Sequence, residues 1–208
     1  YCMGTLYWQL NDCWPVASWS SRDYYGNWKA LHFTAQDVFS PISLSQKLDR
    51  DGRISVWVMT DLAVDIQDTL IISIYNLDGG VAHKVTDLIN KKVEDSELIY
   101  NQKIKINDNQ FIVAELKNKQ VKSKTLFTAE IKNLNFKKPT ISYQIKNNTI
   151  ILQTDIPAFE VYLHGVKGQF SDNFFSLLPG EEKIIEIETP EFNPNNLVIW
   201  SLYDLNKN

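Results

Sequence analysis

Two tryptophans, two amides and a carboxylate lie close together near the N-terminus of the chain. They are Trp8, Gln9, Asn11, Asp12 and Trp14. Sugar recognition uses this combination, because an aromatic ring covers the C–H face of a sugar while amide and carboxylate side chains hydrogen-bond its hydroxyl groups. The cluster is therefore a candidate carbohydrate site. The alternative is that these aromatic residues pack in a core or against a neighbouring domain, and composition alone favours that alternative.

The other reactive side chains are scattered along the sequence. The histidines are His32, His83 and His164, which lack both the spacing of a metal site and an adjacent nucleophile, so we predict structural roles for them. Residues 49–52 (Asp-Arg-Asp-Gly) lack the further ligands of a calcium loop and predict a hairpin turn. Residues 147–149 form a glycosylation sequon, which matters only in a eukaryotic secretory pathway.

The two cysteines predict free thiols rather than a disulfide. Cys2 and Cys13 flank an apolar stretch that resembles a strand. Six extended residues span about 20 Å, whereas a disulfide needs Cα atoms less than about 7 Å apart. We expect neither a metal site nor a cofactor.

The composition is that of a soluble globular protein. The chain has 208 residues, of which 44% are hydrophobic and 22% charged, which excludes a disordered, collagen-like or coiled-coil chain. No apolar run approaches the roughly 20 residues of a membrane span. A net charge of −4 gives no field to hold a nucleic-acid backbone. We therefore expect neither a membrane nor a nucleic-acid partner. The compartment stays open, with a periplasmic or secreted bacterial protein as the working hypothesis.

A strand and a helix would position the aromatic cluster. Residues 5–8 are apolar and aromatic, which predicts a buried strand. From Asn27, a possible N-cap, apolar residues recur at helical spacing as far as Val38, and Pro41 ends the predicted helix. Residues 1–41 are therefore a strand, an aromatic loop and a helix, which is half of a βαβ unit.

The rest of the chain alternates apolar and polar residues with period two. This pattern predicts antiparallel sheets with one solvated face, and we predict two β-sandwiches, at residues 42–137 and 138–208. Residues 147–148 would form a hairpin tip, and Trp57 and Trp200 would be core residues. The alternating residues are Ile54, Val56 and Val58; Leu70, Ile72 and Ile74; Ile104 and Ile106; Ile112, Ala114 and Leu116; Ile141, Tyr143 and Ile145; Ile150 and Leu152; Val161 and Leu163; Ile185 and Ile187; and Val198, Trp200 and Leu202.

The aromatic N-terminal stretch resembles a known enzyme family. Residues 4–15 are Gly-Thr-Leu-Tyr-Trp-Gln-Leu-Asn-Asp-Cys-Trp-Pro, and with residues 18–21 and 28–32 they resemble the end of the catalytic barrel in β-mannosidases of glycoside hydrolase family 2. Residues 170–181 resemble the C-terminal immunoglobulin-like domain of those enzymes, and the stretch containing residues 56–62 is similar to the sandwich between the two. The resemblance covers the chain from end to end in the family's domain order.

The resemblance implies a fold and an origin. The expected fold is mainly β, with two immunoglobulin-like β-sandwich domains preceded by the last β/α unit of a TIM barrel. Residues 1–41 would be the eighth strand and helix of that barrel. The chain begins with Tyr1 rather than Met and shows no signal peptide, so we expect it to be a piece of a longer protein whose remaining barrel residues lie upstream.

The resemblance also implies a reaction. The family hydrolyses terminal β-D-mannose residues with retention, using two glutamates and no cofactor, and its substrates are β-mannosides or mannose-containing oligosaccharides. Retention needs a nucleophilic carboxylate and an acid/base carboxyl about 5–5.5 Å apart. In the family both glutamates come after earlier barrel strands, and the first glutamate of this chain is Glu94. We therefore expect no catalytic residue here, and no activity from the chain alone.

The expected contribution to such an enzyme is one wall of its sugar site. Trp8 would be an apolar wall of the mannose subsite, Asn11 and Asp12 would hold that wall or touch hydroxyl groups, and Trp14 would shape the aglycone side or pack the loop. The sandwiches would support the barrel. The alternative is a non-catalytic carbohydrate-binding or structural accessory module. In the isolated chain, residues 1–41 are expected to be poorly ordered, to fold back on the first sandwich, or to pair with another copy.

Overall fold

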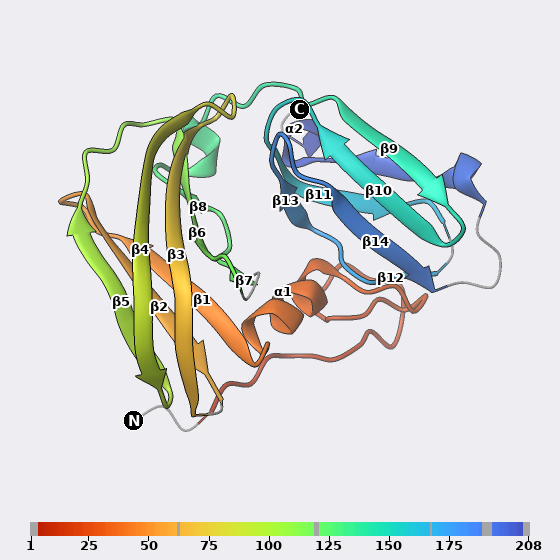
Figure 1. Ribbon diagram of the computed structural model, residues 1–208. Helices are drawn as coiled ribbons and strands as arrows, with labels where there is room; N and C mark the ends of the chain where they lie inside the picture. Colours follow the sequence, from red (N-terminus) through yellow and green to blue (C-terminus); the bar gives the residue numbers. More distant parts are fainter. Residues whose placement is uncertain (1–3, 62, 119–120, 167, 189–192, 206–208) are drawn as a thin grey trace. The chain divides into compact units, whose positions relative to one another are not determined.

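The computed structural model describes residues 4–61, 63–118, 121–166, 168–188 and 193–205 (Figure 1). The chain forms two compact units. One contains Phe39–Lys138, and the other combines Tyr1–Val38 with Pro139–Asn208. Every pairing between named strands is antiparallel, as the alternating pattern predicts. No helix among the described residues is long and apolar enough to cross a membrane.

The unit of residues 39–138 contains a three-stranded and a five-stranded sheet. The first has the order β1-β2-β5, and the second has the order β4-β3-β6-β7 with β8 paired to β6. A single 3₁₀ turn, η1 (Ile131–Asn133), follows the last strand. The strands are β1 (Ile42–Leu48), β2 (Arg53–Thr60), β3 (Val64–Asn76), β4 (Val81–Val93), β5 (Ser96–Lys103), β6 (Gln110–Leu116), β7 (Val121–Lys122) and β8 (Leu126–Phe127).

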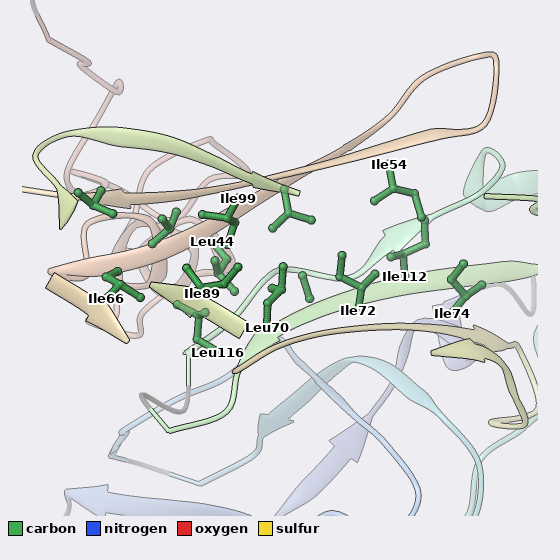
Figure 2. Packing of buried hydrophobic residues seen from close by; sticks show 14 residues of the cluster. Leu44, Ile54, Ile66, Leu70, Ile72, Ile74, Ile89, Ile99, Ile112 and Leu116 are labelled. Atoms are coloured by element: carbon green, nitrogen blue, oxygen red, sulfur yellow. The ribbon is translucent and has the colours of Figure 1, made fainter. Parts of the chain in front are cut away.

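The inner faces of these two sheets form an aliphatic core (Figure 2). Ile54 on β2, Ile72 on β3 and Ile112 on β6 have no exposed surface. Alternation places such residues on one face of each strand, and burying them gives the sandwich its stability. Two expectations need correction here: β5 ends at Lys103, so Ile104 and Ile106 lie outside any strand, although both pack half-buried against this core.

The C-terminal residues form a second sandwich with its own core. One sheet has the order β12-β14-β10-β9 and the other β13-β11-β15. The core cluster includes Ile150, Leu163 and Ile185. The elements are β9 (Ile141–Lys146), β10 (Thr149–Thr154), β11 (Ala158–His164), β12 (Gln169–Phe170), β13 (Phe175–Leu177), β14 (Lys183–Glu188), η2 (Pro194–Asn196), β15 (Val198–Trp200) and α2 (Leu202–Leu205).

Local contacts explain two features of this sandwich. Asn147 has φ +54°, as the predicted hairpin tip between β9 and β10 requires. Asn173 is buried, and its side-chain amide donates to the carbonyl of Leu163 while its amide oxygen accepts from the Leu163 N–H (2.9 and 2.8 Å). This pairing fixes part of the stretch at residues 170–181. Trp200 was predicted to be a core residue, and this is wrong: it is 44% exposed, while Trp57 is half-buried.

The N-terminal segment, residues 4–38, has the predicted helix but not the predicted strand. Helix α1 (Ala30–Val38) ends before Pro41 as expected, but it begins three residues after Asn27. Its buried residue is Phe33, whereas the helical spacing of Trp28, Leu31, Ala35 and Val38 had predicted a different apolar face. Residues 5–8 form no strand, and Leu6 is fully exposed. The physical reason is that a strand needs a neighbour to pair its N–H and C=O groups, and no described strand pairs with this stretch.

The N-terminal segment belongs to the same compact unit as the C-terminal sandwich. The indole Nε1–H of Trp28 donates to Oε1 of Gln169 (3.1 Å), and the rings of Phe33 and Phe174 lie 6.1 Å apart. None of the three arrangements expected for residues 1–41 included this one. The segment packs on the C-terminal sandwich because aromatic side chains from both sides meet there.

Candidate functional site

Backbone hydrogen bonds tie three short stretches of the N-terminal segment together at its base. The N–H of Asp12 donates to the carbonyl of Arg22, the N–H of Arg22 donates to the carbonyl of Leu10, and the N–H of Lys29 donates to the carbonyl of Ser21 (3.0, 3.0 and 2.8 Å). Isolated bridges join Arg22 to Asn11 and to Trp28. Residues 13–19, with Trp14 and Trp19, therefore form a loop that is closed at its base.

The carboxylate of Asp12 is the buried centre of this loop. It accepts from Nζ of Lys29 (2.7 Å) and from Oγ of Ser18 (2.5 Å), and its side chain is 1% exposed. Lys29 also donates to the carbonyl of Ser18 (3.3 Å). The hydrogen bonds from Lys29 and Ser18 lower the pKa of Asp12 to about 2. Asp12 is therefore ionised and paired, and it acts as an internal brace.

A second set of contacts fixes the turn before the helix. Nε of Arg22 donates to the carbonyl of Gly26 (3.0 Å), and its guanidinium lies over the Trp28 ring, 5.0 Å from the centroid. Gly26 has φ +91°, and a Cβ there would lie 3.2 Å from Nη2 of Arg22. The side chain of Asp23 accepts from both the backbone N–H and the Nδ2 of Asn27 (2.8 Å each). These bonds fix the turn before α1, which begins at Ala30.

Large apolar side chains cover the outside of the same segment. Trp8 is 74% exposed and Trp14 is 66% exposed, and the peptide bond between Trp8 and Gln9 is cis. The segment is thus polar inside and aromatic outside, which is typical of a surface that meets a ligand or another part of a protein. The exposed side chains are Leu6, Tyr7, Trp8, Leu10, Trp14, Val16, Trp19, Tyr24 and Tyr25.

The structure separates the four predicted site residues into two groups. Trp8 and Trp14 present their rings outward, whereas Asp12 is buried with its carboxylate occupied. Asn11 is exposed, and its Nδ2 donates to the carbonyl of Asp12 (3.3 Å). Sequence reasoning missed Lys29, because nothing in a spacing of 17 residues indicates that it pairs with Asp12.

The structure also places the histidines and one of the cysteines considered in the sequence analysis. His32 stacks on Trp28 with 3.9 Å between ring centroids, and His164 stacks on Tyr162 at 4.8 Å. His83 lies on β4. Cys13 is free and exposed, and Cys2 lies outside the described residues. In the described part of the chain, no group of three His, Cys, Asp or Glu side chains is placed to hold a metal ion.

Comparison with known proteins shows what this chain is similar to. Residues 133–205 match the model of an Ig-fold domain family named after mannosidase. β-Mannosidase A of Neosartorya fischeri is 28% identical over 97% of this chain, and the β-mannosidase of Capra hircus is 33% identical over 50% of it. The chain matches the C-terminal portion of β-mannosidases. The resemblance inferred from the N-terminal and C-terminal motifs is thereby confirmed.

A solved structure supports the fold over nearly the whole chain. The crystal structure of β-D-mannosidase from Dictyoglomus thermophilum covers 94% of this chain with a TM-score of 0.78 at 22% identity. The match covers 26% of that protein, and this chain spans 25% of the length of the Neosartorya relative. The mainly β fold with immunoglobulin-like sandwiches agrees with the β-mannosidase resemblance. The chain is about a quarter as long as the relatives it matches.

Proposed function

We propose that this chain is the C-terminal part of a retaining exo-β-mannosidase, which hydrolyses terminal β-D-mannose residues. In this proposal residues 1–41 are the last β/α unit of the catalytic barrel, and the sandwiches at 42–137 and 138–208 support it. The observation that carries the proposal is the arrangement of polar and aromatic side chains in the N-terminal segment. Asp12 is buried and paired with Lys29, whereas Trp8 and Trp14 are exposed.

Within the enzyme, Trp8 would form the apolar wall of the mannose subsite. Its ring is exposed and would cover the C–H face of the sugar. Asn11 follows Gln9 and Leu10 in the chain, is exposed, and would reach hydroxyl groups. Asp12 would act indirectly, because Lys29 and Ser18 already occupy its carboxylate. Trp14 would extend the wall toward the aglycone.

The chain alone would be inactive. Retention requires two carboxyl groups about 5–5.5 Å apart, one as nucleophile and one as acid/base. In the described part of the N-terminal segment, Asp12 is held by Lys29, Asp23 is held by Asn27, and the third aspartate, Asp37, lies on α1. The two glutamates that the mechanism needs would come from barrel residues encoded upstream.

The first experiment is to read the gene upstream of Tyr1 and assay the product. A barrel with glutamates at two strand ends is expected, and the full-length protein should release mannose from an aryl β-mannoside with retention, as followed by NMR. The 208-residue chain should show no turnover. An unrelated upstream domain, or turnover by the chain alone, would overturn the proposal.

A pair of variants of the full-length protein tests the sugar wall. Trp8→Ala is expected to lower kcat/KM by about 10- to 100-fold, which corresponds to losing the burial of one large apolar side chain. The matched control is Tyr143→Ala, which removes an exposed aromatic ring from β9 of the C-terminal sandwich. Equal effects of the two substitutions would contradict the role of Trp8.

A further inference from the structure

The side-chain ammonium of Lys29 bonds to both ends of one exposed loop. It donates to Oδ2 of Asp12 (2.7 Å) before the loop, and to the carbonyl and Oγ of Ser18 (3.3 and 3.2 Å) after it. Oγ of Ser18 also donates to Oδ1 of Asp12 (2.5 Å), which joins the two ends directly. Residues 13–17, between these ends, are exposed and include Trp14. They are called the Trp14 loop below.

The backbone holds Lys29 in place at the start of α1. Its N–H donates to the carbonyl of Ser21 (2.8 Å), and its carbonyl accepts from the N–H of His32 (3.0 Å). The helix begins at the next residue, and its Phe33 is buried. The ammonium of Lys29 therefore connects the Trp14 loop to a helix that is packed in place.

The position of the Trp14 ring depends on these contacts at the base of its loop. Residues 13–17 lie outside every helix and strand that the structure describes, and the ring itself is 66% exposed. Holding the two ends of a loop together removes conformations that a free chain would adopt. The contacts of Lys29 therefore limit where the ring can lie.

Loss of the ammonium would open the base of the Trp14 loop. The side chain of Asp12 is 1% exposed, and a buried carboxylate that has lost its charged partner is strongly destabilising. The carboxylate would turn toward water, and its hydrogen bond with Ser18 would break. An apolar side chain at position 29 would therefore leave both ends of the loop unattached, whereas a second type of cationic donor would still pair with Asp12.

Trp8 is held in a different way. The carbonyl of Gln9, the residue after Trp8, accepts from the N–H of Ser21 (3.1 Å). This bond joins two backbone groups, so a change of the side chain at position 29 does not remove it. The ammonium of Lys29 therefore acts on the Trp14 loop rather than on Trp8.

We propose that Lys29 is a positioning residue of the enzyme, because its ammonium holds the Trp14 loop and thereby sets the aglycone side of the sugar site. This inference rests on the proposed function, in which Trp14 extends the apolar wall toward the aglycone. Lys29 then matters most for substrates whose aglycone is itself a sugar.

Two substrates of the full-length protein test this selectivity. β-1,4-Mannobiose places a second sugar on the aglycone side, whereas β-mannosyl fluoride places a single atom there. Lys29→Met should lower the ratio of kcat/KM for mannobiose to kcat/KM for the fluoride about tenfold, mainly through KM for mannobiose. Lys29→Arg keeps a cationic donor and should restore most of this loss. The matched control is Lys47→Met, which removes the partner of the surface residue Asp49 and should leave the ratio unchanged.

A double-mutant cycle shows whether Lys29 acts through Trp14. Trp14→Ala alone should lower the same ratio, and adding Lys29→Met to Trp14→Ala should lower it little further, because residues that act through one contact are not additive. Additive losses would show that Lys29 acts independently of Trp14 and would overturn the inference. Ser18→Ala removes one bond at the base of the loop and should change the ratio in the same direction by less. This variant serves if Lys29→Met does not fold.

NMR relaxation of the indole N–H groups tests the same contacts in the 208-residue chain without any assay of activity. Lys29→Met should increase the fast motion of the Trp14 indole and leave the Trp28 indole, which donates to Gln169, as rigid as in the wild type. Unchanged motion of Trp14 in a folded Lys29→Met chain would overturn the inference, as would equal losses of kcat/KM for the two substrates. A wild-type full-length protein that hydrolyses neither substrate would refute the proposed function, and the relaxation measurement would still decide whether Lys29 holds the loop.

Discussion

The first sandwich and the N-terminal segment use apolar side chains in opposite ways. In the sandwich, residues such as Ile54 and Ile72 are fully buried between sheets. In the segment, Trp8 and Trp14 are largely exposed, while Asp12 is buried. The sandwich completes its own core, whereas the segment is held by hydrogen bonds and leaves large aromatic side chains exposed. The two regions therefore differ in what their apolar side chains do: in the sandwich they are buried and stabilise the fold, whereas in the segment they stay on the surface.

The largest expected effect comes from truncating the first sandwich's core. Ile72→Ala should lower the free energy of unfolding by about 2–5 kcal/mol, through lost burial and the cavity left behind. Urea denaturation followed by circular dichroism measures it. The control is Leu88→Ala on neighbouring β4, which is 80% exposed and should change stability by less than about 0.5 kcal/mol. Similar losses in both variants would contradict the burial pattern.

A smaller effect is expected from removing the brace of the N-terminal segment. Lys29→Met deletes the main partner of Asp12, so the pKa of Asp12 should rise from about 2 toward its ordinary value of 3.8. A depressed carboxyl pKa contributes stability above the unfolded pKa, and this contribution is lost as the pH falls from about 4 to about 2. Over this pH range, Lys29→Met should therefore lose less stability than the wild type does.

Carbon-13 NMR titration of the Asp12 carboxyl group measures the pKa, and urea denaturation at several acidic pH values measures the stability. Lys47→Met is the control, because its partner Asp49 is a surface residue and such pairs contribute about 0–1 kcal/mol. An unchanged Asp12 pKa in Lys29→Met would show that Lys29 is not the brace.

The strands of the sandwich could be predicted from the sequence, whereas the contacts of the N-terminal segment could not. Alternation of Ile54, Val56 and Val58 predicted β2 correctly, because period two and burial on one face are properties of the strand itself. The predicted strand at residues 5–8 failed, because a strand also needs a partner and an apolar run does not name one. The pairing of Asp12 with Lys29 was missed for the same reason: contacts between distant residues leave no periodic signal.

A third prediction concerns the two stacked histidines. Burial lowers the pKa of both His32 and His164 below the ordinary 6.5. The unfolded chain therefore takes up protons first as the pH falls below 6.5, and stability that is present above this pH is progressively lost. His164→Phe and His32→Phe keep the rings but cannot be protonated. Each should flatten the dependence of unfolding free energy on pH between about 6.5 and 5, and a slope equal to the wild type's would refute this reading.

The smallest expected effect is that of Trp14→Ala on the stability of the chain. The ring is 66% exposed, so the unfolding free energy should change by no more than about 0.5 kcal/mol. Trp28→Ala is the contrasting variant, because Trp28 donates to Gln169, stacks on His32 and lies under Arg22. Trp28→Ala should lower the free energy of unfolding more than Trp14→Ala does, and urea denaturation measures both. If Trp14→Ala cost as much as Trp28→Ala, the Trp14 ring would be packing within the chain, and the distinction between a supporting and a binding surface would fail at this residue. If Trp14→Ala is silent for stability yet weakens catalysis in the full-length protein, that exposed ring serves the ligand rather than the fold.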